Sequence, residues 1–421
     1  MSNFSKQETV AFEQILEGFE DAMVMSHNVN IYKTDPTIME RSGDQIWRPQ
    51  PYVAKSFDGS DQTGNFGSYT QLSVPATIGY HKSVPWQMTA TELRDMLQEK
   101  RLGDSARQKI GSDVNRAVLD AATAYGSVVV KRTTAASGYD DVAEASATFD
   151  ELGINEFDRR LALSARDYNG MASNLAARQT INEKPTAAYE KSYVGDVAGF
   201  ETFKLNYTNR LTAAAGVSVT INGANQYYVP AATSTAATGE RSNVDNRFQD
   251  LAITVSSGTV KVGDCFTIAG VYSVHHITKQ ATSQLKTFRI TAIKTGAGGT
   301  GTVTITPAII SNGGSTLAEE IYKNVDSTPA NGAAIVFLNT VSAYMNPFWT
   351  KNSIELLPGT IPVQSGSGAE VMRGSTSQGI ELVMIKFLNN KTLNYEYRFD
   401  SRFGVVNLNP EMSGIMLFSQ S

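Results

Sequence analysis

The feature that most limits the fold of this 421-residue chain is an abrupt change of pattern in its middle. No charged residue lies between Leu211 and Gly239, and short alternating strands with turns follow as far as about Val341. These segments read LAITVSS, DCFTIAGV, LKTFRITAIK, GTVTITPAI and AAIVFLNTV. Their regular spacing is typical of a small antiparallel barrel or sandwich. Because helical pattern precedes this module and mixed strands follow it, the sequence predicts an all-β unit inserted into an α+β domain.

Composition narrows the class of protein. Cys265 is the only cysteine, so an internal disulfide is excluded, the fold must depend on packing, and a reducing compartment is the natural setting. The net charge is −5 with 18% charged residues, and no block of like charges is typical of a nucleic-acid-binding tail. The N-terminus lacks a basic start followed by an apolar run, and no apolar stretch reaches about 18 residues. We therefore expect a soluble product made in a cytoplasm, without a secretory signal or membrane span.

Residues 7–25 have the pattern of an amphipathic helix. Apolar side chains recur at spacings of three and four, at Phe12, Ile15, Leu16, Phe19 and Met23. Acidic side chains take the other positions, at Glu13, Glu17, Glu20 and Asp21. Two interpretations stay open: a surface helix packed on its own domain, or an arm that docks on another chain.

Three further segments carry clear patterns. Between 41 and 86, proline-punctuated extended segments flank a glycine-rich centre, which predicts a long hairpin with a mobile tip. Residues 104–125 carry one apolar stripe and end before Gly126, which predicts a long spine helix with a C′ glycine. In LNYEYRFD (393–400) strict alternation predicts a strand with Leu393, Tyr395, Tyr397 and Phe399 on one face.

The stretch GDCFTIAGVYSVHH (263–276) raises the question of a metal or thiol site. Adjacent histidines in a strand point to opposite faces, and one cysteine without a second His/Cys cluster is too few ligands for structural zinc. The alternation around Cys265 predicts that it fills core. TGAGGTG (295–301) lacks the Lys-Ser/Thr ending and the following helix of a phosphate loop, so it predicts a hairpin turn. No catalytic cluster or cofactor site emerges, and the sequence predicts no enzyme.

Four segments resemble one known family. ERSNVDNRF (240–248) followed by TVKVGDCFTIAGV (259–271) resembles the major coat proteins of short-tailed phages of the Salmonella type. VAGFETFKLN (197–206) and the closing RFDSRFGVVNLNPEMSGIML (398–417) also resemble that family. The resemblance is continuous from about Asp196 to the end and collinear upstream. It implies the Hong Kong 97 fold of tailed-phage capsids with an inserted antiparallel β-barrel, the I-domain.

The resemblance also implies a domain plan. It assigns 1–40 to an N-arm, 41–86 to an E-loop, 87–132 to a P-domain with the spine helix, 133–212 and 343–380 to an A-domain, 213–342 to the I-domain with a D-loop at about 229–243, and 381–421 to P-domain and C-terminal strands. Candidate contact residues follow from it. They are Glu13, Glu17, Glu20 and Asp21 for a scaffolding protein, Glu240, Arg241, Asp245 and Arg247 between capsomers, and Arg48, Lys55, Asp58 and Asp61 in the E-loop. Because few of these charges lie in the D-loop itself, polar or main-chain contacts are expected there.

The implied function is that of a major capsid protein. Such a protein assembles in the host cytoplasm with a scaffolding protein into an icosahedral procapsid of hexamers and pentamers. The procapsid carries a portal protein, matures, and encloses double-stranded DNA that it contacts non-specifically. Two alternatives remain at this point: a β-rich tail, adhesion or carbohydrate-binding structural protein, and a hydrolase with an ancillary β-domain. The first predicts clustered exposed aromatic residues, and the second a catalytic cluster.

Overall fold

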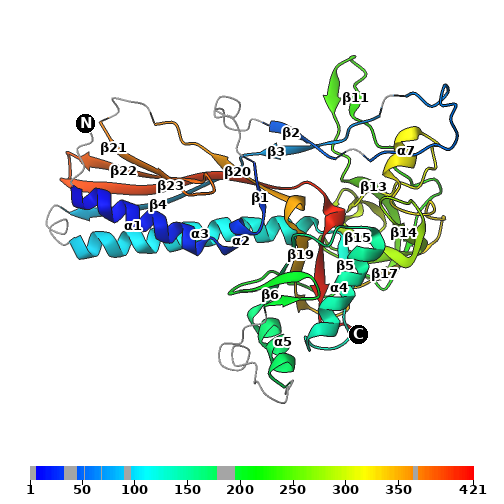
Figure 1. The fold of residues 1–421 in the computed structure, drawn as a ribbon, viewed down its shortest axis with the longest axis horizontal. Coiled ribbons are helices and arrows are strands. Elements are labelled where there is room, and N and C mark those ends of the chain that lie inside the picture. Colours follow the sequence, from blue (N-terminus) through cyan, green and yellow to red (C-terminus); the bar gives the residue numbers. More distant parts are fainter. Residues whose placement is uncertain are drawn as a thin grey trace. The chain divides into compact units, whose positions relative to one another are not determined.

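The computed structural model describes residues 6–32, 45–51, 53–67, 69–89, 96–177, 195–363 and 368–421. The chain divides into two compact units (Figure 1). The first comprises 1–46, 75–121 and 354–406, and the second comprises 47–74, 122–353 and 407–421.

The first unit is built on a long, mainly antiparallel sheet. Its strands follow the order β1 (Asn30–Ile31), β20 (Ile354–Gly359), β23 (Asn394–Asn407), β22 (Glu381–Asn389) and β21 (Glu370–Ser375). Strand β4 (Tyr80–Thr89) pairs with β23 from Thr89↔Asn394 to Tyr80↔Phe403. Tyr397 and Phe399 are buried as the alternation predicts, and Trp86 stacks on Tyr397 at 5.6 Å between ring centroids. Leu393 is instead 66% exposed, because it lies in the turn before β23 with a φ of +52°.

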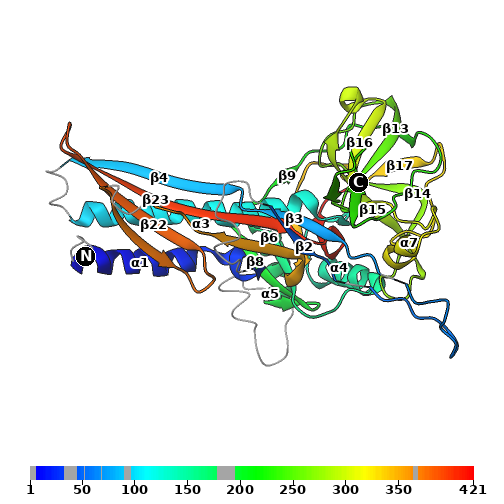
Figure 2. The ribbon, with the colours of Figure 1, turned by 90° about the horizontal axis from the view of Figure 1, so that it is seen from above.

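Two helices lie within the first unit, α1 (Lys6–Ala22) and α2 (Val24–His27), and most of α3 (Met96–Tyr125) lies there as well. Figures 1 and 2 show α1 lying along the sheet strands, and the Phe12 ring meets that of Phe399 at 6.2 Å. The helix predicted over 7–25 is confirmed, with a break at Met23 (ψ 61°). The spine helix predicted over 104–125 begins earlier, at Met96, and passes through Gly103. A Cβ at Gly103 would lie 2.5 Å from Ile15 Cδ1, so this glycine allows α1 to approach closely.

The second unit contains a mixed sheet and a barrel. The sheet order is β5 (Val128–Lys131), β24 (Ser413–Leu417), β19 (Asn346–Thr350), β6 (Arg159–Ser164), β8 (Phe200–Leu205) and β7 (Asp196–Val197). Helices α4 (Tyr139–Leu152) and α5 (Ala165–Ala177) belong to the same region. Phe149, Phe200 and Phe348 meet in its core, which explains why these apolar strand and helix faces pack together.

The predicted β-module is a closed antiparallel barrel. Its strands are β10 (Ser218–Ile221), β13 (Gln249–Ser257), β16 (Gly301–Thr306), β15 (Ala281–Ile293), β14 (Cys265–Val274) and β17 (Ala334–Phe337). The turn predicted at 295–301 joins β15 to β16 through the 3₁₀ turn η2 (Gly296–Gly298). Just outside the barrel, β9 (Arg210–Leu211) pairs with β18 (Ala343–Tyr344) through Leu211↔Ala343. The chain therefore enters and leaves the barrel at one place, as an inserted domain must.

Several smaller elements lie outside the two large sheets and the barrel. Strands β11 (Thr233–Thr235) and β12 (Arg241–Asn243) form one hairpin, and β2 (Gln45–Pro49) pairs with β3 (Ser73–Thr77). Helix α7 (Leu317–Tyr322) and the 3₁₀ turns η3 (Lys351–Ser353) and η4 (Pro410–Met412) lie between strands.

Strand pairing differs from the expected grouping in two places. Segment 343–380 was expected as one part of an A-domain, but β19 pairs in the second unit while β20 and β21 pair in the first. Segment 41–86 was expected as one hairpin, but β4 joins the long sheet. Alternation predicts that a segment is a strand but not which partner it chooses, since partner choice depends on distant residues. The names and boundaries of the domains remain predictions.

Candidate assembly surfaces and the Glu411 hub

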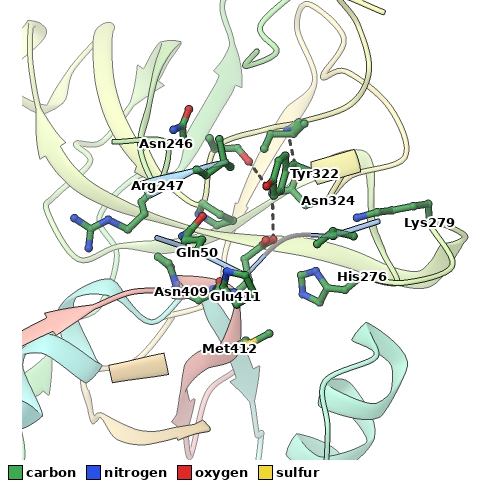
Figure 3. A pocket seen from close by; sticks show the side chains of 17 residues that line it. Gln50, Asn246, Arg247, His276, Lys279, Tyr322, Asn324, Asn409, Glu411 and Met412 are labelled. Atoms are coloured by element: carbon green, nitrogen blue, oxygen red, sulfur yellow. Dashed lines mark hydrogen bonds between the residues drawn. The ribbon is translucent and has the colours of Figure 1, made fainter. Parts of the chain in front are cut away.

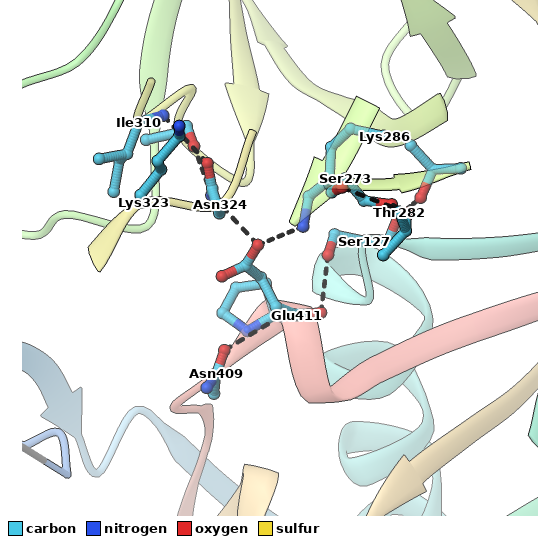
Figure 4. A network of polar contacts seen from close by, with 12 residues as sticks. Ser127, Ser273, Thr282, Lys286, Ile310, Lys323, Asn324, Asn409 and Glu411 are labelled. Carbon is cyan, nitrogen blue, oxygen red and sulfur yellow. Dashed lines mark hydrogen bonds and ion pairs between the residues drawn. The ribbon is translucent and has the colours of Figure 1, made fainter. Parts of the chain in front are cut away.

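The Glu411 carboxylate links the closing segment of the chain to the barrel within the second unit. Asn409 and Pro410 set up the short 3₁₀ turn η4, in which Asn409 Oδ1 accepts a hydrogen bond from Glu411 N at 3.1 Å. This turn places the Glu411 side chain among barrel residues (Figure 4). Glu411 Oε1 accepts hydrogen bonds from Lys286 Nζ of β15 and from Asn324 Nδ2, the latter at 3.1 Å. We call Glu411, Lys286 and Asn324 the Glu411 hub.

Burial gives the Glu411 hub its energetic weight. The side chains of Lys286 and Glu411 are 4% and 16% exposed. Burial by itself would raise the pKa of Glu411, but attraction to Lys286 and His276 outweighs it and lowers the pKa to about 2. The carboxylate is therefore ionised at every pH at which the protein is expected to fold. Removing either Glu411 or Lys286 would leave the other charge buried without a partner.

Two further basic side chains lie near the hub. Burial lowers the pKa of His276 to about 4 and that of Lys279 to about 8. His276 Nε2 is buried and has no hydrogen-bond partner among the residues that the structure describes. His276 N donates to Leu152 O of α4 at 2.9 Å, so the loop that carries it joins the barrel to the neighbouring sheet domain.

A cavity of about 150 Å³ adjoins the hub (Figure 3). Gln50, Leu72, His276, Tyr322 and Glu411 are among its lining residues. Figure 3 shows Glu411 near its centre and the Arg247 guanidinium directed away from it. The cavity is below the roughly 300–1,000 Å³ usual for ligand pockets, and its size suits a few water molecules. Across the described ranges, no three His, Cys, Asp or Glu side chains gather as a metal site would require.

The thiol of the stretch that raised the metal question is carried by barrel strand β14, but it packs outside the barrel core, in a cluster with Val129, Leu211, Met345, Ile415 and Leu417. Cys265 is 0% exposed, which confirms the prediction that it fills core. Burial raises the pKa of its thiol to about 11, against the opposing attraction of Arg289. A thiol in this state is a poor nucleophile at neutral pH.

The D-loop candidates fall into two groups. Glu240 and Arg241 lie on the exposed β11–β12 hairpin, where Arg241 donates to Thr233 Oγ1 at 3.1 Å. Asp245 and Arg247 instead pair with each other, through Nε–Oδ1 at 2.9 Å and Nη2–Oδ2 at 2.6 Å. Arg247 Nη1 also donates to Asn407 O at 2.6 Å. This second pair therefore supports the stem of the loop within one chain.

Asn246, between those two residues, was not singled out from the sequence as a site. Its side chain exchanges two hydrogen bonds with the backbone of Ala231, accepting from N at 3.0 Å and donating to O at 2.9 Å. A side-chain amide is well suited to this exchange, because it offers one acceptor and one donor side by side. The short motif NVDNRF thus contains the clamp for the base of the hairpin.

The E-loop candidates are partly engaged within the chain. Lys55 Nζ lies 2.5 Å from Glu320 Oε2 of α7, and Asp61 Oδ1 accepts from Thr63 N at 3.1 Å. The hydrogen bonds from Thr63 lower the pKa of Asp61. Asp58 is exposed, and Arg48 in β2 is partly buried. The structure brings none of the four together as one cluster.

The acidic residues of α1 are only partly described. Glu13 and Glu17 are exposed, on the side away from buried Phe12 and Phe19. The side chains of Glu20 and Asp21 lie outside the described residues. The helix thus packs its apolar face on its own unit, as one of the two open interpretations predicted, and keeps at least two acids at the surface.

No helix in the described ranges has both the length and the apolar character needed to cross a bilayer.

Comparison with known proteins identifies the class. A family model described as P22 coat protein, gene protein 5, matches residues 1–419. The I-domain of the CUS-3 coat protein is 43% identical over 29% of this chain and 96% of its own, with a TM-score of 0.23. A structure from Mycobacterium phage Che8 covers 94% of this chain and 90% of its own at 8% identity and a TM-score of 0.44. The capsid structure of cyanophage P-SCSP1u covers 93% of this chain and 86% of its own, at 10% identity and a TM-score of 0.43.

The family match covers almost the whole chain, so the protein is the major capsid protein of a tailed phage and a structural component of the virion. The chain belongs to the P22 coat protein family.

Proposed function

We propose that this capsid protein assembles with a scaffolding protein into an icosahedral procapsid of hexamers and pentamers. The procapsid then matures and encloses double-stranded DNA, with a portal protein in the shell, and assembly takes place in the host cytoplasm. Family membership over residues 1–419 carries this proposal. The role requires no catalytic group. A net charge of −5 favours a shell that surrounds DNA without binding it tightly.

Small energies repeated by symmetry account for ordered assembly. An exposed ion pair contributes roughly 0–1 kcal/mol, too little to hold two molecules together against association costs of several kcal/mol. Repeated at every subunit of a closed shell, such pairs set register and let wrong contacts dissociate. We assign this role to Arg48, Asp58 and Asp61 in the E-loop and to the D-loop hairpin, whereas Lys55 pairs with Glu320 of its own chain.

We propose the acidic face of α1 as the contact for a basic scaffolding protein, with Glu20 and Asp21 as further candidates beside Glu13 and Glu17. The supporting observation is that Glu13 and Glu17 stay exposed on a helix whose other face is buried. Glu13→Lys with Glu17→Lys should give folded subunits that assemble poorly with scaffold, because both attractive charges are reversed. Electron microscopy of co-expressed coat and scaffold measures the yield of shells.

A matched control separates this contact from general charge effects. Glu151→Lys with Glu156→Lys makes the same change in net charge at two exposed positions of the second unit. The control should assemble more completely than the α1 variant. A normal shell yield from the α1 variant, or an equal loss in both, removes α1 as the scaffold contact.

We propose the β11–β12 hairpin as the contact between capsomers, through polar groups and Glu240 and Arg241. Its burial pattern supports this, since all three residues of β12 are exposed. Glu240→Ala with Arg241→Ala should leave subunit stability within about 0.5 kcal/mol and lower the yield or heat stability of shells. Asp245→Asn should instead destabilise the subunit itself, because it leaves Arg247 without its charged partner. Subunit unfolding and shell heating curves distinguish the two effects.

A further inference from the structure

The arm between β2 and β3 has no strand ladder to hold it in the described ranges. Residues 53–67 and 69–72 contain no strand, and at the base Gln50 N donates to Leu72 O at 2.8 Å. If a segment of this length becomes ordered only when it binds another chain, binding costs much conformational entropy. Contacts other than strand pairing must therefore position the arm if it is to meet another chain in one conformation.

Helix α7 of the barrel domain contacts both sides of this arm. On the outgoing side, Lys55 Nζ lies 2.5 Å from Glu320 Oε2. On the returning side, Tyr322 OH donates to Thr70 O at 2.9 Å. Between them, a Cβ at Gly67 would lie 3.7 Å from Leu317 Cδ2, so the leucine side chain packs against this glycine. Three residues of one six-residue helix therefore hold three points of the arm.

The helix is itself firmly fixed. Thr316 and Glu319 form a capping box, in which Glu319 N donates to Thr316 Oγ1 at 3.2 Å and Glu319 Oε2 accepts from Thr316 N at 3.1 Å. Glu319 is 0% and Ile321 3% exposed, which turns Glu320 outward to the arm. The contact surface on α7 is thus preformed, while the arm is the part that adapts.

The contacts on this surface are weak enough to be reversible. Both charged side chains of the Lys55–Glu320 pair are 38% exposed, so water and salt screen their attraction. Phe66, one residue before Gly67, is 89% exposed, and most residues between Asp58 and Phe66 are exposed as well. The arm is therefore held at Lys55, Gly67 and Thr70, and the segment between the first two is open to a neighbour.

We propose that α7 is a docking surface for the chain's own arm, holding residues 53–67 and 69–72 in a defined conformation in the unassembled subunit. This inference rests on the proposed function, because it gives the E-loop a preorganised state before it meets a second copy of the chain. Ordering the arm in advance removes part of the entropy cost of association. The inserted barrel thereby controls how readily subunits join, although it lies elsewhere in the sequence.

Zero-length carbodiimide coupling of isolated wild-type subunits tests the docking directly. An amide between Lys55 and Glu320 forms with loss of water only while the two side chains are in contact, and peptide mass spectrometry detects it. The exposed pair Lys294–Asp250 on the barrel is an internal positive control in the same digest. A Lys55–Glu320 peptide that is lost in Glu320→Gln supports the proposal. Its absence while Lys294–Asp250 couples overturns it.

Hydrogen exchange of the isolated subunit measures the ordering. Glu320→Gln with Tyr322→Phe should speed exchange in 53–72 by about tenfold, since one exposed ion pair and one hydrogen bond are lost. Asp250→Asn should leave that segment unchanged. Equal exchange in the wild type and the double variant contradicts the proposal.

Assembly with scaffold separates this inference from the proposed function. Glu320→Lys should raise the subunit concentration needed for shells by about 3- to 10-fold, and Lys55→Glu with Glu320→Lys should recover it. Coupling in isolated subunits without any shell formation contradicts only the proposed function. Shells that form normally from a variant with no coupling contradict only the role given to α7.

Discussion

Replacing the buried carboxylate of the Glu411 hub should destabilise the second unit strongly. Glu411→Gln keeps the side-chain shape but leaves Lys286, 4% exposed, without a counter-charge. The pKa of Glu411 is about 2 against an ordinary 4.5, and this difference of 2.5 corresponds to about 3 kcal/mol of stability. Loss of one partner from a buried pair typically costs about 3–5 kcal/mol, so two independent routes agree.

Heating experiments on isolated subunits measure this cost. A loss of about 3 kcal/mol should lower the unfolding temperature of the second unit by about 6–12 °C, given about 2–4 °C per kcal/mol for domains of this size. Hydrogen exchange in β15, which carries Lys286, should rise in parallel. Glu320→Gln is the matched control, because its ion pair is 38% exposed on both sides and should contribute less than about 1 kcal/mol.

A second variant and a pH series sharpen the interpretation. Glu411→Gln combined with Lys286→Met should recover part of the stability, since neither charge is then buried alone. In the wild type, a lowered folded-state pKa means that this stabilisation is complete above about pH 4.5 and is lost as the pH falls towards 2. If Glu411→Gln unfolds within about 2 °C of the wild type, or if Glu320→Gln is equally damaging, the hub does not stabilise the fold as described.

Three other outcomes follow from the structure. Burial lowers the pKa of His276 from 6.5 to about 4, so between these two pH values the imidazole binds a proton in the unfolded chain but not in the folded one. Stability should therefore fall by about 2–3 kcal/mol as the pH drops from 6.5 to 4. In His276→Gln, the denaturation midpoint should change less with pH over the same range. Gly258→Ala should lower the free energy of unfolding by about 2–5 kcal/mol, because a Cβ at this φ of +85° would lie 2.0 Å from Ala215 O. Gly270→Ala has a similar φ of +79° but no atom within 4 Å, so it should lower the free energy of unfolding by about 1 kcal/mol. Thermal unfolding of the two variants measures the difference. Cys265, 0% exposed with a pKa of about 11, should react with a maleimide at pH 7.5 far more slowly in the native subunit than in guanidine. Equal rates would show that the packing of β14 against Val129, Ile415 and Leu417 opens freely.

The parts of the fold that sequence predicted are those set by local pattern. Alternation located the strands of the barrel, and spacing of apolar residues located α1 and α3. The start of the spine helix shows the limit. Gly103, just before the predicted range, lies inside α3 and allows close contact with Ile15, some 90 positions away in the chain. Partner choice also escaped prediction: β20 resembles any short apolar strand, and only its pairing with β1 and β23 puts it in the long sheet.

The same distinction applies to the candidate sites. Exposed charges such as Glu13 and Glu17 could be predicted, because the helix period fixes which face they occupy. The Glu411 hub could not, since Lys286, Asn324 and Glu411 lie on three separate segments. One signal was present: Lys286 stands within an apolar strand and Glu411 within an apolar closing segment, and a charge in such surroundings requires a buried partner.

The pairing of Leu211 with Ala343 has a consequence for how such shells diversify. A barrel whose two ends meet at one rung can be gained, lost or exchanged without rerouting the chain that carries it. The limit on such exchange is chemical rather than topological: a domain that replaces the barrel must offer Glu411 a positive partner in place of Lys286, or it buries an unmatched negative charge.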